Sequence, residues 1–220
     1  PKIFCGISDG TPLLNPIFSK TGLITYHGPD LIFTFGLPMS PMIKENLMKT
    51  LFEGKVGQLH PNPNWKGLDE LNKNEKYEGW HCVRKGKASG KLVGGNVNCL
   101  ISLENTDFRP DYKNSILFLE AYIATAEDLH QAFVHFRQAK IFDKINGLIL
   151  GHFYGSHMED KAQDRKIDDL ILEVTRDYSF PILEIGELGH NVENYILPIG
   201  CMATIDADKK YFSIDEPTVL

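Results

Sequence analysis

Five short runs of the chain are strongly apolar and rich in β-branched or aromatic side chains, which is typical of strands covered on both faces of a parallel sheet. These runs are residues 2–7, 23–26, 116–119, 147–151 and 182–185. Further strands are expected around a turn at residues 80–84 and 90–93, and as a hairpin at 202–205 and 211–214 that turns at 206–209.

Helices are expected between several of these strands. Residues 125–140 carry apolar side chains at i, i+3, i+4 and i+7, and Thr125 with Asp128 resembles a capping box. A helix over residues 40–52 would begin after Ser40 as its N-cap. The other helices are expected at residues 11–19, disturbed by Pro16, and at residues 160–176. Strands and helices in this order predict an α/β fold.

The length of the chain and a change in its composition suggest more than one unit. Its 220 residues exceed the ~100–150 residues of most domains. Between residues 54 and 79 the composition shifts to Pro, Asn, Gly and Lys with few apolar residues, as in loops. We therefore expect a linker or active-site loop at 54–79, between an N-terminal unit (1–53) and a C-terminal unit (80–220).

The charge balance excludes some classes of partner. Asp and Glu outnumber Lys and Arg by 29 to 23, a formal net charge of -6, whereas nucleic-acid binding requires a basic surface. No apolar stretch approaches the ~20 residues of a membrane-spanning helix, and no charged-then-apolar leader marks export. We expect a cytoplasmic protein with neither nucleic acid nor a membrane as its partner.

The cysteines and two histidines bear on metal binding. The four cysteines are scattered without a C-x-x-C pair, which argues against a zinc knuckle or a dithiol redox site. They are expected to be buried free thiols in a reducing compartment. His152 and His157 follow a strand end and could line a cleft or form a weak metal site. We favour a protein without metal or cofactor.

Gly6-Ile7-Ser8-Asp9-Gly10 fits the pattern G-x-S-x-G between an expected strand and an expected helix. In that context the two glycines permit a sharp turn that lifts the Ser hydroxyl clear of the sheet, and the following N–H groups can bind an oxyanion. Ser8 is therefore a candidate nucleophile. The alternative is a plain strand-to-helix turn in which Ser8 caps the helix.

A nucleophilic serine requires a histidine as base and an acid that orients this histidine. Among eight histidines, His190 lies in a loop after a buried strand, where catalytic bases are commonly found. Glu120 comes directly after the apolar run 116–119, which places its carboxylate at the end of a sheet strand. The alternative is that Glu120 caps the next segment, and the sequence alone does not show that the three residues meet.

Several short motifs follow one another in a specific order along the chain. They are Gly6-Ile7-Ser8-Asp9, Tyr26-His27-Gly28-Pro29, Gly90-Lys91-Leu92-Val93-Gly94-Gly95-Asn96, Arg109-Pro110-Asp111, Ile116-Leu117-Phe118-Leu119-Glu120, Gly147-Leu148-Ile149-Leu150-Gly151, Gly189-His190 and Leu197-Pro198-Ile199-Gly200. This ordered set resembles the LD-carboxypeptidases, a family of serine peptidases that includes the microcin C immunity enzymes. The resemblance implies Ser8 as nucleophile, His190 as general base, Glu120 as its orienting acid and the Asp9 backbone N–H as an oxyanion donor.

The resemblance also implies a fold. It predicts the end of a flavodoxin-like parallel-sheet domain, followed by a β-rich α/β C-terminal domain that carries Glu120 and His190. Family members have roughly a hundred further residues ahead of this point, including a Gly-rich loop with a second oxyanion donor. We therefore expect that the 220 residues alone lack that donor. Family members are commonly dimers, so a homodimer is expected.

The family resemblance implies a small peptide or peptidyl-nucleotide as substrate. Removal of the terminal D-Ala from a murein tetrapeptide is the favoured expectation. The alternatives are hydrolysis of an aminoacyl-nucleotide conjugate and a catalytically silent binding protein. Trp65 could stack on a nucleobase or anchor its loop, and Asn96 could bind substrate or form a turn. Some immunity-like members carry a Lys at the position of Ala124, which weakens the nucleotide alternative.

Overall fold

The computed structural model describes residues 2–32, 34–70, 72–155 and 166–219 and contains two β-sheets. The large sheet has eight strands, in the spatial order β3 (Gly57–Leu59), β11 (Tyr211–Ile214), β10 (Met202–Asp206), β5 (Lys87–Asn96), β6 (Ser115–Tyr122), β7 (Gly147–Tyr154), β8 (Ile182–Gly189) and β4 (His81–Arg84). Its centre, β5 to β8, is parallel, and the outer strands pair antiparallel. The fold is therefore α/β with a mixed sheet.

A small sheet of three strands lies beside the large one. Its order is β1 (Cys5–Gly6), β2 (Thr25–His27) and β9 (Leu197–Ile199). β1 and β2 are parallel, as in the end of a parallel-sheet layer, whereas β9 adds antiparallel to β2. The first residues of the chain and a strand from near its end thus form one sheet.

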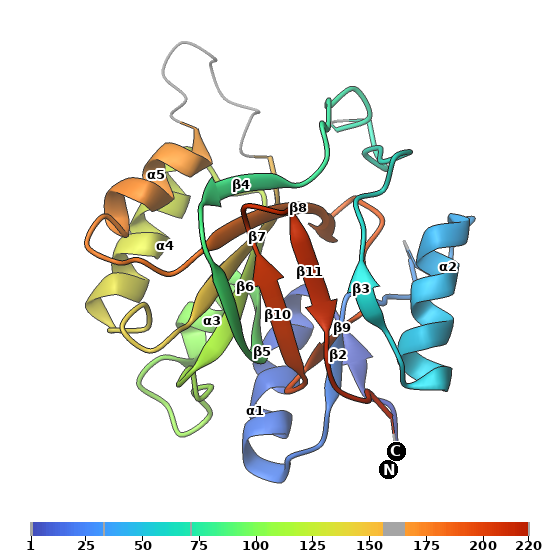
Figure 1. Cartoon of the computed structure of the whole chain (residues 1–220), viewed down its shortest axis with the longest axis horizontal. Helices are drawn as coiled ribbons and strands as arrows, with labels where there is room; N and C mark the ends of the chain where they lie inside the picture. The colour runs from blue at the N-terminus through green and yellow to red at the C-terminus, as the bar shows by residue number, and fades with distance from the viewer. Residues whose placement is uncertain (1, 33, 71, 156–165, 220) are drawn as a thin grey trace.

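The helices are α1 (Thr11–Thr21), α2 (Pro41–Met48), α3 (Val97–Leu103), α4 (Ala126–Gln138) and α5 (Ile167–Val174). A π-helical turn, η2 (Lys49–Glu53), extends α2. Figure 1 shows α4 and α5 together against one flank of the large sheet and α2 at the opposite flank. Among the described residues, none of the helices combines the length and the apolar character needed to cross a membrane.

The side chains of the central strands alternate between two apolar cores. One core lies between the sheet and α4 and α5 and includes Leu117, Leu119 and Phe133. The other lies towards α1 and the small sheet and includes Ile116 and Phe118. Because both faces of β6 are covered, its sequence is apolar from Ile116 to Leu119, as expected for a central parallel strand.

Local sequence signals explain the helix ends. Thr125 and Asp128 form a complete capping box at α4, and the Ser40 side chain accepts a hydrogen bond from the Ile43 N–H at α2. Both predicted caps are confirmed. α1 continues through Pro16 to Thr21 and ends at Gly22, whose φ of 74° is the left-handed conformation that favours glycine.

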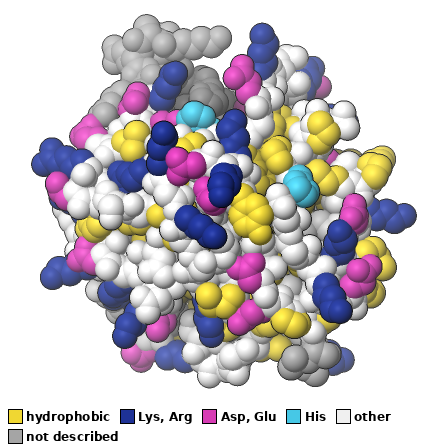
Figure 2. Space-filling view, in the orientation of Figure 1, with side chains coloured by type: hydrophobic (Ala, Val, Ile, Leu, Met, Phe, Trp, Pro, Cys, Tyr) yellow, Lys and Arg dark blue, Asp and Glu magenta, His cyan; other side chains and the backbone are white. Residues whose placement is uncertain are grey.

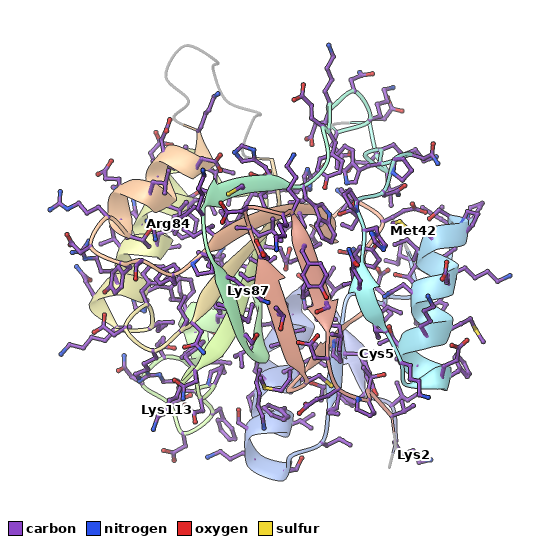
Figure 3. The ribbon with its side chains drawn as sticks, in the orientation of Figure 1. Lys2, Cys5, Met42, Arg84, Lys87 and Lys113 are labelled. Carbon is purple, nitrogen blue, oxygen red and sulfur yellow. The ribbon has the colours of Figure 1, made fainter. Side chains whose placement is uncertain are left out.

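Some predicted strands and helices differ in the structure. β4 and β5 are not partners around a turn, because β4 pairs with β8 at the edge of the sheet and β5 lies between β10 and β6. Arg84, labelled on β4 in Figure 3, donates from Nη2 to the backbone oxygen of Thr175 after α5 (2.8 Å), which holds this edge strand in place. β3, β9 and α3 were not predicted. Of the helix expected at 160–176, residues 160–165 lie outside the described residues.

The unit boundaries at residues 53 and 79 stay predictions. The expected loop 54–79 contributes β3 to the large sheet, and β9 from the C-terminal unit completes the small sheet. On the face shown in Figure 2, acidic and basic side chains are interspersed, in keeping with the modest net charge of -6.

Candidate active site

Ser8 lies in a strained turn between β1 and α1. Ile7 is extended (φ -138°, ψ 171°), and Ser8 then takes a φ of 56° at the start of the 3₁₀ turn η1 (Ser8–Gly10). A positive φ is uncommon for a residue other than glycine and often marks a functional site. Neither η1 nor α1 has a side-chain cap hydrogen bond at its start. Ser8 therefore does not act as a helix cap, which was the alternative role.

The Thr11 side chain, directly after the Ser8 turn, lies close against the backbone at the end of β5. The Thr11 hydroxyl accepts a hydrogen bond from the backbone N–H of Asn96 (3.1 Å). Gly95 has a φ of 139°, and a Cβ at this position would lie 2.5 Å from Thr11 Oγ1. Asn96 is in turn the strand partner of Glu120. These contacts bring the Ser8 turn to the same edge of the large sheet as Glu120.

Glu120 and His190 form a buried acid–base pair. Glu120 is fully buried at the end of β6, and His190, directly after β8, lies with Nδ1 2.6 Å from Glu120 Oε2. Because the carboxylate accepts, Nδ1 carries the proton that it donates, and the other ring nitrogen, Nε2, is left with a lone pair. Glu120 is therefore not a cap of the next segment, and His190 is oriented as a base.

His27 lies between this pair and β1, the strand that leads to Ser8. It lies in β2 opposite Gly6 of β1, and the Gly28 N–H donates to the Gly6 oxygen (3.0 Å). His27 Nε2 is 3.9 Å from Glu120 Oε1, and its ring meets the Phe118 ring edge-on. Sequence reasoning did not assign His27 a role, although the motif Tyr26-His27-Gly28-Pro29 marked its position.

The predicted triad residues are thus brought to one region, but only two of them are in direct contact. Glu120 and His190 are hydrogen-bonded, whereas no hydrogen bond joins Ser8 to His190 in the described part of the chain. Ser8 is linked to the pair through β1, β2 and the contact of Thr11 with Asn96. The triad itself stays a prediction.

Hydrogen bonds hold the loop over residues 54–79 against β8, the strand that leads to His190. Glu187 in β8 is buried and accepts hydrogen bonds from the Asn62 N–H (2.6 Å) and Trp80 Nε1 (2.7 Å). Burial raises the pKa of Glu187. Trp65 Nε1 donates to the Gly186 oxygen (2.7 Å) and its indole packs against Tyr77. Trp65 thus makes the contacts of a loop anchor, and its stacking on a nucleobase stays a prediction.

His152 packs against the Trp65 ring and contacts the backbone of His190. Its Nε2 is 2.7 Å from Glu75 Oε2, and its Nδ1 is 3.2 Å from the backbone oxygen of His190. Both partner atoms are hydrogen-bond acceptors. His157 lies outside the described residues. Across the part of the chain that the structure describes, no three His, Cys, Asp or Glu side chains are grouped as metal ligands.

Two further predicted site residues have structural contacts here. Asn96 is the N-cap of α3 and its Oδ1 accepts from the Cys99 N–H (3.3 Å), so the expected turn role is seen, while substrate binding stays a prediction. Asp9, the predicted oxyanion donor, lies in η1 with its Oδ1 3.6 Å from Cys99 Sγ. Burial, with Asp9 as a lesser cause, raises the pKa of Cys99 to about 12.

All four cysteines are free thiols, as expected, but they are not all buried. Cys201 is buried, Cys82 and Cys99 are half-buried, and Cys5 is exposed. The expectation of four buried thiols therefore holds only for Cys201. It is wrong for the half-buried Cys82 and Cys99, and most clearly for the exposed Cys5, which lies in the two-residue strand β1 (Figure 3).

An exposed aromatic surface lies next to His190. Tyr122, which is 46% exposed, stacks on Tyr154 and its ring centroid lies 4.8 Å from that of His190. A separate groove of about 580 Å³ is lined by Val192, Lys66 and the start of α2. Of the two surfaces, only that of Tyr122 is in contact with the His190 ring in the described part of the chain.

A serine at a strained strand-to-helix turn and a buried Glu–His pair are both features that serine hydrolases share, and here they occur in one α/β fold. Residues 89–205 match the family model of the LD-carboxypeptidase C-terminal domain, and the chain belongs to the LD-carboxypeptidase family. The predicted family is thus confirmed.

Relatives along the whole chain agree with this family. The chain is 29% identical to a Vibrio cholerae protein named as a candidate carboxypeptidase, over 98% of this chain and 67% of the relative. It is 30% identical to the microcin C7 self-immunity protein MccF of Escherichia coli, over 98% of this chain and 66% of MccF. The chain therefore spans about two thirds of the length of these relatives.

A solved structure of MccF in complex with aspartyl sulfamoyl adenosine matches the fold. The TM-score is 0.86 at 29% identity, and the match covers 100% of this chain and 69% of that one. The predicted α/β fold class is confirmed by this match.

Proposed function

We propose that this chain carries the catalytic residues of a serine carboxypeptidase that removes the terminal D-Ala from a murein tetrapeptide. The observation that carries the proposal is the buried contact of 2.6 Å between His190 Nδ1 and Glu120 Oε2. A surface histidine gains little from such a partner, but a histidine that must take up a proton is stabilised by a buried carboxylate in its charged form. The family match supports the reaction class.

The proposed reaction assigns one step to each residue. Ser8 Oγ attacks the carbonyl carbon of the scissile amide, and its proton passes to His190 Nε2. The Asp9 backbone N–H donates to the oxyanion of the tetrahedral intermediate. His190 then gives the proton to the leaving amine, the C–N bond breaks, and an acyl-Ser8 ester remains. Water, deprotonated by His190, hydrolyses the ester and restores Ser8.

The proposed site requires His190 to be neutral before the attack. Because a free lone pair on His190 Nε2 must accept the Ser8 proton, the rate of hydrolysis should fall as the pH is lowered. The Ser8 hydroxyl is not engaged as a cap of η1 or α1 among the described residues, which leaves it available for the attack.

Hydrolysis of an aminoacyl-nucleotide conjugate is the second candidate function. It is favoured by the similarity to MccF, whose solved structure holds aspartyl sulfamoyl adenosine. Trp65, in the loop over residues 54–79, would then stack on the base. Ala124, where some immunity-like members have a Lys for an acidic aminoacyl group, is buried here and speaks against an acidic aminoacyl substrate.

Mass spectrometry of two incubations tests the proposal. The full-length protein is incubated with a murein tetrapeptide ending in D-Ala, and separately with an aminoacyl-sulfamoyl adenosine. Each incubation is paired with the Ser8→Ala variant. We expect release of D-Ala from the tetrapeptide by the wild type and none by Ser8→Ala.

The other outcomes discriminate between the candidates. Cleavage of the nucleotide conjugate alone would overturn the carboxypeptidase proposal in favour of the second function. Hydrolysis that persists in Ser8→Ala and stops with a chelator would refute the Ser8 mechanism. No turnover of either compound would favour a catalytically silent binding protein. The predicted homodimer is checked separately by light scattering of the same sample.

A further inference from the structure

His27 is a fully buried histidine that the proposed reaction does not use. Its exposed fraction is 0%, and neither ring nitrogen has a hydrogen-bond partner in the described part of the chain. A buried polar group without a partner is destabilising, because it loses its hydrogen bonds to water and gains none within the protein. A histidine in such a place is therefore expected to have a function that an apolar side chain could not fulfil.

The free oxygen of Glu120 lies opposite this ring. Glu120 Oε2 is bonded by His190, whereas Oε1 is buried and has no hydrogen-bond partner in the described structure. The distance from His27 Nε2 to Glu120 Oε1 is 3.9 Å. An oxygen that only accepts and a ring nitrogen that can donate thus face one another, and among the described residues neither atom has a hydrogen-bond partner.

The charge state of His27 follows from its surroundings. Burial lowers the pKa of His27 to about 4, against the opposing effect of Glu120, and the nearby His190 lowers it further. Glu120 on β6 and His190 after β8 are the titratable groups that act on this ring. At neutral pH the ring is uncharged and has a single N–H, which the facing carboxylate favours on Nε2.

Strand pairing holds the backbone of His27 in place. β2 is the central strand of the small sheet, with β1 on one side and β9 on the other. Gly28 has a φ of 119°, and a Cβ there would lie 2.4 Å from the backbone oxygen of Tyr195. His27 therefore lies in the strand next to the one that leads to Ser8, and its ring reaches from there to within 3.9 Å of Glu120 on β6.

We propose that His27 is a positioning residue of the catalytic centre: its Nε2–H supports Oε1 of Glu120 and directs Oε2 towards His190. The proposal rests on the proposed roles of Glu120 and His190. The present 3.9 Å exceeds a hydrogen bond, and a movement of about 1 Å would form one. Catalytic hydrogen bonds are often long without substrate and shorten when it binds.

The bond has a chemical consequence for the proton on His190. A carboxylate that accepts at both oxygens holds its negative charge more firmly and is a weaker base. With a less basic Glu120 beside it, His190 holds the proton taken from Ser8 less tightly and can pass it to the leaving amine. A more basic Glu120 would make the Glu120–His190 pair hold this proton more tightly. Loss of the His27 donor should therefore move the acid limb of the pH–rate profile to higher pH.

Three variants of the full-length protein test this role. His27→Phe keeps a planar ring without a donor, and His27→Gln keeps an N–H donor. Thr25→Val is the matched control, because Thr25 lies in the same strand, is equally buried and donates to the Leu14 oxygen, away from Glu120. We expect His27→Phe to lower kcat about tenfold at pH 7, with KM little changed, and to raise the acid-limb midpoint by about one pH unit.

The variants should differ in kcat and in the acid limb of the pH–rate profile, which a role of His27 in packing alone would not explain. His27→Gln should keep kcat within about threefold of the wild type, and Thr25→Val should leave the acid limb in place even where it lowers the melting temperature. An unmoved acid limb in His27→Phe, or an equal loss in His27→Phe and His27→Gln, would overturn the proposal.

A second measurement does not depend on turnover. In the Ser8→Ala background, the ring resonances of His190 are titrated by NMR with and without His27→Phe, and are assigned by their loss in His190→Gln. We expect the titration midpoint to rise in His27→Phe. An unchanged midpoint would refute the role of His27, whereas absence of hydrolysis with a raised midpoint would refute only the proposed function.

Discussion

The buried, uncharged state of His27 predicts a measurable dependence of stability on pH. In the unfolded chain the imidazole takes up a proton near its ordinary value of 6.5, whereas in the folded protein burial lowers the pKa of His27 to about 4. Between these values only the unfolded state binds the proton. The free energy of unfolding therefore falls as the pH is lowered from 6.5 to 4 and is fully present above 6.5.

The size of the effect follows from the two values. The difference between 6.5 and about 4 corresponds to about 3 kcal/mol, because one pKa unit is worth about 1.4 kcal/mol. His27→Phe removes this titration and keeps an apolar ring against Phe118. Groups that titrate in both proteins cancel in the comparison, so the variant should lose about 3 kcal/mol less than the wild type between pH 7 and pH 4.

The assay is urea unfolding of the full-length protein, followed by tryptophan fluorescence at half-unit pH steps. Thr25→Val serves as the control, and its curve should run parallel to that of the wild type. His27→Gln replaces His27→Phe if the latter does not fold. A constant difference between wild type and variant over this pH range would refute the reasoning that His27 is buried and uncharged.

Other residues allow further tests. Gly95→Ala puts a Cβ 2.5 Å from Thr11 Oγ1 at a φ of 139°, and should cost about 2 kcal/mol or more in urea unfolding; an unchanged midpoint would contradict the close approach. Glu120→Gln should lower kcat about 10³-fold with KM little changed, and a loss below tenfold would argue against its role. Burial and Asp168 raise the pKa of Glu184 to about 7. The stability it confers is therefore present below pH 4.5 and lost as the pH rises through 7, so Glu184→Gln should melt higher than the wild type at pH 8; equal melting temperatures there would contradict this.

The sequence predicted those features that depend on neighbouring residues. The helix at α4 follows from a capping box and an apolar face within one segment, and the turn at Ser8 follows from its two glycines. Glu120 was singled out because a carboxylate directly after a fully apolar strand is unusual. Each of these signals lies within a few residues of the feature that it predicts.

The features that were missed depend on residues far apart in the chain. β9 is only three residues long, and it is a strand because β2 offers it a free edge. The contact of His27 with Glu120 joins the small sheet to the large one and has no counterpart in the local pattern. For the same reason, the anchoring of Trp65 to Gly186 could not be distinguished in advance from a role in binding.

The central claim is that Ser8 is a nucleophile activated by His190, and covalent trapping tests it without knowledge of the substrate. The full-length protein is incubated with a fluorophosphonate, and the site and rate of modification are measured by mass spectrometry. We predict a single adduct on Ser8 that is absent in Ser8→Ala and forms at least about a hundredfold more slowly in His190→Gln. Modification at another residue, or at Ser8 with the same rate in His190→Gln, would contradict the claim.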